Sequence, residues 1–126
     1  MNPVKTDETL FVKLHNEWIS NLYAYEEQLN QINTITRQLQ STVNDMQYQR
    51  QLHQICTEII LQKNVVNILT EEVLLLRKRF NEQADKQIIT LADLMENNRY
   101  RDKLRKTEQE IFMLKYQVNK LLSLAS

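Results

Sequence analysis

The chain of 126 residues contains no glycine and a single proline, Pro3. Glycine supplies the left-handed backbone conformations of tight turns and helix C-caps, and proline interrupts helices and strands. A chain that lacks both is poorly suited to the turns of a sheet protein, to a phosphate-binding loop or to an oxyanion loop. The same scarcity favours long, uninterrupted helices.

Cysteine, net charge and long apolar runs are also scarce. The single cysteine, Cys56, excludes a disulfide within these residues and is typical of a reducing compartment. The 16 Lys and Arg residues balance the 16 Asp and Glu residues, so no overall field attracts nucleic acid or membrane. No apolar run approaches the ~20 residues of a membrane span, and the first residues lack the apolar core of a signal peptide. We therefore expect a cytoplasmic or nuclear protein without a membrane span.

Apolar residues recur at coiled-coil spacing along most of the chain. Steps of three and four residues alternate, as in a heptad repeat whose a and d positions are buried. The pattern predicts an all-α fold, an elongated coiled coil of about three helical segments separated by register breaks. The predicted segments are residues 7–46, 50–95 and 99–124, after a short tail at 1–6.

The residues predicted to bind partner helices share large apolar side chains at the repeating positions. They are Phe11, Trp18, Leu22, Tyr25, Leu29, Ile32, Leu39, Ile59, Val66, Leu69, Val73, Leu76, Leu104, Ile111, Leu114, Val118 and Leu121. The aromatics Trp18 and Tyr25, with Tyr23 nearby, fit a groove that binds another protein, and fit ordinary burial in a helix bundle equally well. Polar members of the rows, such as His15 and Thr36, would limit self-pairing.

Two register breaks interrupt the rows. The first lies within Ser41–Gln51. It indicates either a skipped register in one continuous helix or a turn in which Asn44 forms a left-handed cap. The second covers roughly residues 81–98, where Asn97 and Asn98 form the best turn candidate.

The middle segment is more apolar than one heptad row requires. Beside the row that runs from Ile55 to Leu76, a second row contains Leu61, Val65, Ile68 and Leu75. A wide apolar arc needs several neighbouring helices. We expect at least two other helices, from a fold-back of the chain or from partner chains, to cover this stretch, because large exposed apolar patches are rare in monomers.

The sequence contains no motif typical of a catalytic, cofactor-binding or metal-binding site. His53 and Cys56 would share a helical face and could supply half of a zinc site, but the other histidine, His15, lies far away in sequence. Cys56 lies among isoleucines, which disfavours a reactive thiolate. We therefore expect a protein that is not an enzyme and that carries no cofactor and no metal.

A basic cluster occupies residues 99–106: Arg99, Arg101, Lys103, Arg105 and Lys106, opposed by Asp102. Such a cluster could contact phosphates or an acidic partner helix. Because no ladder of aromatic residues suited to stacking bases accompanies it, the sequence favours a solvated or partner-facing surface over nucleic acid.

One stretch resembles a known family. Residues 9–39 resemble the C-terminal coiled-coil region of the central-channel FG nucleoporins. The matching residues are Trp18 and Leu22, then Tyr25, then Asn33, Arg37 and Leu39, with a further apolar, Gln-containing match at 59–62, Val66 and Leu69. The Trp-Asp pair of the family is replaced here by Ile35 and Thr36. A chain without glycine also cannot contain Phe-Gly repeats.

The resemblance implies a subunit that assembles with two other coiled-coil nucleoporins in the nuclear pore channel. Independently of it, the residues favour a non-enzymatic coiled-coil scaffold subunit of a heteromeric complex, and a homo-oligomer remains open. One alternative is a cytoskeletal, kinetochore or tethering coiled-coil subunit. The other is a helical nucleic-acid-binding protein that uses the basic cluster at 99–106.

Overall fold

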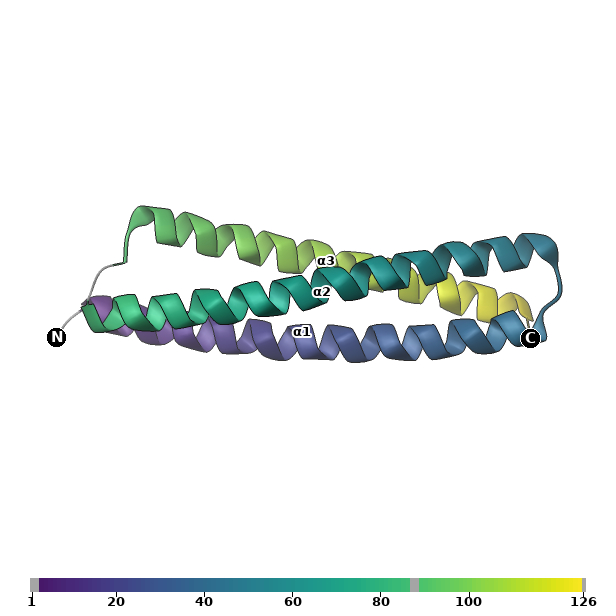
Figure 1. Ribbon diagram of the computed structural model, residues 1–126, viewed down its shortest axis with the longest axis horizontal. Helices are drawn as coiled ribbons and strands as arrows, with labels where there is room; N and C mark the ends of the chain where they lie inside the picture. Colours follow the sequence, from purple (N-terminus) through teal and green to yellow (C-terminus); the bar gives the residue numbers. More distant parts are fainter. Residues whose placement is uncertain (1–2, 87–88, 126) are drawn as a thin grey trace.

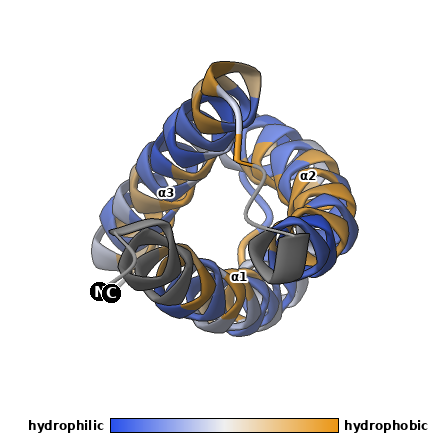
Figure 2. Ribbon diagram, turned by 90° about the vertical axis from the view of Figure 1, so that its left-hand side faces the viewer, coloured by the Kyte–Doolittle hydropathy of each residue, from blue (hydrophilic) through white to orange (hydrophobic). Residues whose placement is uncertain are grey.

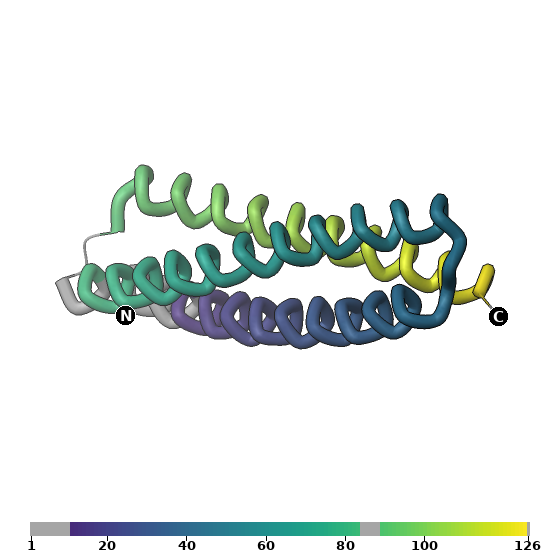
Figure 3. Tube along the Cα trace, turned by 45° about the vertical axis from the view of Figure 1, so that its right-hand side comes forward, coloured from purple at the N-terminus to yellow at the C-terminus, as the bar shows by residue number. Residues whose placement is uncertain are grey.

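The computed structural model describes residues 3–86 and 89–125, with side chains described at 11–83 and 89–125. It contains three long helices, α1 (Pro3–Thr42), α2 (Met46–Lys86) and α3 (Leu91–Ala125). Each helix runs back along the one before it (Figure 1, Figure 3). The fold is all-α, as the sequence predicts, and the described residues contain no strand.

The three helices pack side by side in a bundle. Viewed along its length, the bundle has one helix at each corner of a triangle (Figure 2). The turn between α1 and α2 lies at the same end as the C-terminus of α3 (Figure 1). At that end the Tyr48 hydroxyl donates a hydrogen bond to the Leu121 carbonyl oxygen at 2.6 Å. Each helix contacts both others, so the chain covers its own heptad rows.

The core consists mainly of the a and d positions of the three helices, with Ile19 buried beside the α1 row. In α1 the buried row includes Leu22 and Leu29, and in α2 it runs without interruption from Leu52 to Phe80. In α3 it runs from Asp93 to Leu121. This agreement follows from helix geometry, since residues three and four apart lie on one face.

The first register break is a turn, which is one of the two alternatives that the sequence left open. Residues 43–45 connect α1 to α2. Asp45 caps α2, because its Oδ1 accepts a hydrogen bond from the Tyr48 backbone nitrogen at 2.9 Å. Asn44 lies in this turn. Met46, predicted to belong to the first segment, instead begins α2 and is exposed.

The second break lies earlier than predicted. Helix α2 ends at Lys86 and α3 begins at Leu91, so Asn97 and Asn98 are inside a helix rather than in a turn. The predicted boundaries 50–95 and 99–124 are therefore wrong. A reciprocal capping box starts α3: the Thr90 nitrogen donates to Asp93 Oδ2 at 2.9 Å, and the Asp93 nitrogen donates to Thr90 Oγ1 at 3.2 Å.

The start of α1 also differs from the prediction. The helix begins at Pro3, so residues 3–6 are helical and do not form a tail. Proline is well tolerated at the first position of a helix, because its missing N–H has no intrahelical partner there.

Candidate interaction surface

The residues predicted to bind partner chains lie inside the bundle. All of them from Trp18 to Leu121 are buried, and Phe11 is partly buried against the same core. Their neighbours are the other helices of the same chain. In this fold, Trp18 and Tyr25 are ordinary core residues, while Tyr23 is exposed. A partner chain must contact other residues as long as the bundle stays closed.

A polar and aromatic layer crosses the core near the connection between α2 and α3. His15 is fully buried, and its Nε2 lies 2.6 Å from Asn97 Oδ1. Because an amide oxygen only accepts hydrogen bonds, Nε2 donates. The imidazole packs edge-on against Phe80, with ring centroids 5.0 Å apart, and also lies against Trp18. Asn97 therefore satisfies the buried His15 in the core, whereas the sequence pattern predicted a turn at this position.

The second ring nitrogen of His15, Nδ1, is buried and has no hydrogen-bond partner among the described residues. Burial lowers the pKa of His15 below its ordinary 6.5, against the opposing effect of the Asn97 hydrogen bond, and the charge of Arg77 lowers it further. The neutral imidazole is therefore the form that the fold stabilises.

We expect the free energy of unfolding to fall as the pH drops from about 7 to about 5, where unfolded histidines become protonated. A folded-state pKa below the unfolded value means that the stabilisation is present above pH 6.5 and is lost below it. Urea unfolding across this range measures the effect. The variant His15→Gln keeps an amide donor for Asn97 but cannot titrate, so its pH dependence should be smaller. An unchanged slope in this variant would contradict the assignment.

The second apolar row predicted on α2 is only partly covered. Val65 and Leu74 are half-buried against the core. By contrast, Ile60 is 63% exposed, Leu61 52%, Ile68 57% and Leu75 67%. Fold-back of the chain thus covers the heptad core of α2 and leaves its flank open. We call Leu61, Ile68 and Leu75, which are seven residues apart, the outer row.

The outer row lies on the side of α2 that faces α3. The g positions of α2 contact α3: Tyr100 Oη donates to Glu72 Oε2 at 2.6 Å, and Arg79 pairs with Glu96. The opposite flank faces α1, where Arg77 donates to Asn16 Oδ1 at 2.7 Å. In a heptad, c positions lie just outside g positions on the same flank. Because the outer row occupies c positions, it borders the groove between α2 and α3.

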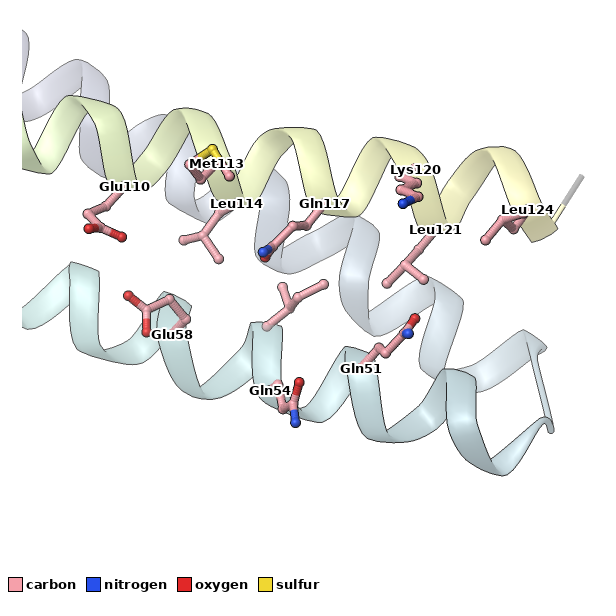
Figure 4. A pocket seen from close by; sticks show the side chains of 11 residues that line it. Gln51, Gln54, Glu58, Glu110, Met113, Leu114, Gln117, Lys120, Leu121 and Leu124 are labelled. Carbon is pink, nitrogen blue, oxygen red and sulfur yellow. The ribbon is translucent and has the colours of Figure 1, made fainter.

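The groove between α2 and α3 opens into a pocket of about 710 Å³ toward the C-terminal end of α3. Figure 4 shows Leu114, Gln117 and Leu121 of α3 pointing toward α2, across from Glu58 and Gln51. The pocket is lined by c, d and g positions of both helices, and Gln54 of its lining occupies the same c position as the outer row, one heptad before Leu61. The outer row continues along the same flank of α2 beyond this pocket, beside the junction of α2 and α3.

A second hollow, also about 710 Å³, lies between α1 and α3. Its walls include Gln28, Arg105 and Phe112. At its edge the Tyr25 hydroxyl donates to Glu108 Oε2 at 3.0 Å, and burial together with this carboxylate raises the pKa of Tyr25 to about 12. This hollow has fewer aliphatic residues than the groove between α2 and α3.

The basic cluster of α3 divides between the two flanks of that helix. Arg99 and Lys103 lie on the α2 side, since both cations are close to the Tyr100 ring, at 5.8 Å and 5.0 Å from its centroid. Lys106 follows on the same flank by helical spacing. Arg105 faces the hollow toward α1, and Arg101 shares its flank. All five cationic side chains are exposed.

The remaining candidate residues, His53 and Cys56, do not form a metal-binding group among the described residues. His53 is exposed, and Cys56 is half-buried with its Sγ 3.5 Å from Gln40 Nε2. Within the described residues, no group of three or more His, Cys, Asp or Glu side chains could hold a metal ion. Across the same part of the chain, no helix is long and apolar enough to cross a membrane.

Comparison with protein-family models, with curated proteins and with solved structures found no match. The resemblance to the nucleoporins therefore stays a prediction from the residues that carry it.

Proposed function

We propose that the protein is a non-enzymatic helical scaffold subunit that assembles with partner helices in a heteromeric complex. The observation that supports it is the outer row. Three large aliphatic residues at heptad spacing remain more than half exposed on a chain that buries its a and d positions well. Exposed apolar rows of this kind mark protein interaction sites.

The spacing of the outer row favours a helix as the partner. Residues seven apart on α2 match two turns of a second helix laid alongside it. Full burial of a leucine or isoleucine contributes about 1.5–3 kcal/mol, so even partial burial of three or four such side chains supports stable association. The nuclear pore channel, implied by the resemblance at residues 9–39, is the named instance of this proposal.

Affinity purification of the tagged chain from its source cells tests the proposal. We expect Ile68→Asp to reduce recovery of stoichiometric partner proteins by about tenfold or more, since a carboxylate on the outer row cannot be buried against an apolar helix. The matched control is Asn64→Asp, which adds the same charge at an exposed outward position of α2. It should retain the partners. Equal circular dichroism spectra of both variants would exclude a folding defect.

Full recovery of the partners with Ile68→Asp would contradict the proposal. Steeply salt-dependent recovery of nucleic acid with the wild-type chain, lost on Arg101→Ala and Arg105→Ala, would favour the nucleic-acid alternative.

A further inference from the structure

We propose that the groove between α2 and α3 binds an acidic amphipathic helix of a partner protein as a fourth helix of the bundle. This inference rests on the proposed function and adds the chemistry of the partner. Its basis is the juxtaposition of two different rows along one groove. The side formed by α2 carries the outer row, and the side formed by α3 carries Arg99, Lys103 and Lys106.

The outer row of α2 and the cations of α3 lie at the same level along the bundle. Tyr100 bonds to Glu72 across the groove at 2.6 Å, and farther toward the α2–α3 connection Arg79 bonds to Glu96. Because the helices are antiparallel, moving back along α2 from Glu72 corresponds to moving forward along α3 from Tyr100. Ile68 therefore lies opposite the part of α3 that contains Lys103 and Lys106.

In the middle of the groove, opposite Ile68, the cations Arg99, Lys103 and Lys106 outnumber the carboxylate of Glu72, while Glu58 and Glu110 line the pocket toward the C-terminal end of α3. Arg99 and Lys103 both lie beside the Tyr100 ring, and the carboxylate that reaches the same place, Glu72, already accepts a hydrogen bond from the Tyr100 hydroxyl. This local positive charge, which lies between Glu96 and Glu110 along α3, is on the same flank of the bundle as the exposed outer row. A partner helix with an apolar stripe flanked on one side by Asp or Glu would pack its stripe against the outer row and pair its carboxylates with the cations of α3. Opposite charges at the rim of an interface orient and select the partner.

The dimensions also fit a helix. Leu61 and Leu75 are 14 residues apart, which is roughly 21 Å along α2 at ~1.5 Å per residue. A partner segment of about three heptads covers this length. The pocket beyond Leu61 is lined by Glu58 and Glu110, so the acidic residues of the partner belong opposite Arg99, Lys103 and Lys106.

Two other occupants fit less well. A second copy of the chain paired symmetrically through this groove would bring its own Arg99, Lys103 and Lys106 near the same cations, which is repulsive. A nucleic acid would match the cations but would leave the outer row exposed, and the exposed aromatic ring of Phe112 lines the hollow between α1 and α3 rather than this groove.

The test uses the full chain and a fluorescein-labelled peptide of about 21 residues, with Leu at its a and d positions and Glu at e and g. A twin peptide carries Lys in place of every Glu. In fluorescence anisotropy at about 0.15 M salt, we expect the acidic peptide to bind about tenfold or more tightly than its twin. Ile68→Asp should weaken binding of the acidic peptide by a similar factor.

A matched pair of charge variants locates the selectivity. The double variant Lys103→Glu/Lys106→Glu should abolish or reverse the preference for the acidic peptide. The control Arg101→Glu/Arg105→Glu makes the same change in net charge on the α1 flank of α3 and should keep most of the preference. Loss of the preference in both variants to the same extent would show that net charge, and not this groove, selects the peptide.

The remaining outcomes separate this inference from the proposed function. Equal binding of the two peptides, lost with Ile68→Asp, overturns the acidic partner and leaves the helical scaffold standing. A duplex RNA of matched length that binds more tightly than the peptide, and is lost with Lys103→Glu/Lys106→Glu but not with Ile68→Asp, overturns it in favour of nucleic acid. A dimer of the chain that Ile68→Asp converts to monomer overturns it in favour of a second copy. If neither peptide binds, the inference fails, while the purification with Ile68→Asp still decides the proposed function.

Discussion

Replacing Leu29 with Asp should unfold the chain. Leu29 lies near the middle of α1 and has no exposed surface. The substitution removes about 1.5–3 kcal/mol of apolar burial and places a carboxylate in the core with no cation to pair with it. Together these effects approach the whole stability of a small domain, typically about 5–15 kcal/mol. Circular dichroism should show that most of the helical signal at room temperature is lost, and Leu69→Asp should behave in the same way.

The matched control for Leu29→Asp is Gln31→Asp, two residues farther along α1. It introduces the same side chain on the exposed face, so its effect should stay within about 0.5 kcal/mol. Glu27→Ala, also exposed, should be equally mild. If the Leu29→Asp variant remained helical and had the same melting temperature as the wild type, α1 would not pack against the other two helices.

Replacing Phe80 with Ala should lower the free energy of unfolding by about 3–5 kcal/mol, the usual cost of deleting a buried phenyl ring. Phe80 is 1% exposed near the end of α2. Its ring lies against Phe11 with centroids 5.2 Å apart, and against the imidazole of His15. The cavity would leave both rings and the hydrogen bond from His15 to Asn97 poorly supported. Urea unfolding of the two proteins gives the difference directly.

Phe112→Ala is the control for Phe80→Ala. It deletes the same ring from a side chain that is 68% exposed on α3, so a change within about 0.5 kcal/mol is expected. Equal losses from the two variants would mean that the aromatic layer described around His15 is not part of the folded core.

The heptad rows were predictable because helical periodicity alone decides which side chains can be buried together. The buried positions of α2 from Ile55 to Leu76 agree with the sequence prediction. What periodicity does not give is the identity of the neighbour. The rows predicted to contact partner chains instead contact the other helices of their own chain, because residues 43–45 form a turn rather than a register shift.

The second break was misplaced because a polar residue at a core position looks like an interruption of the row. Asn97 is buried and bonded to His15, 82 residues away in sequence, a partner that no local pattern reveals. The signal that does locate this break is local: the Thr90-x-x-Asp93 spacing of a capping box. The wider apolar arc on α2 was predictable from residues 61–75. The position of the basic residues of α3 beside it was not, because it depends on how α2 and α3 pack together.

Small-angle X-ray scattering of the purified chain tests most directly the claim that the heptad rows cover one another within one molecule. A bundle of three helices of about 40 residues has a maximum dimension of roughly 60–70 Å, with the scattering mass of one chain. A chain that continued as one helix through residues 43–45 and 87–90 would instead extend to roughly 150 Å or more. The compact value at monomer mass is the result expected here. An extended particle would show that the buried rows belong to other chains, and that the outer row is not the surface left for a partner.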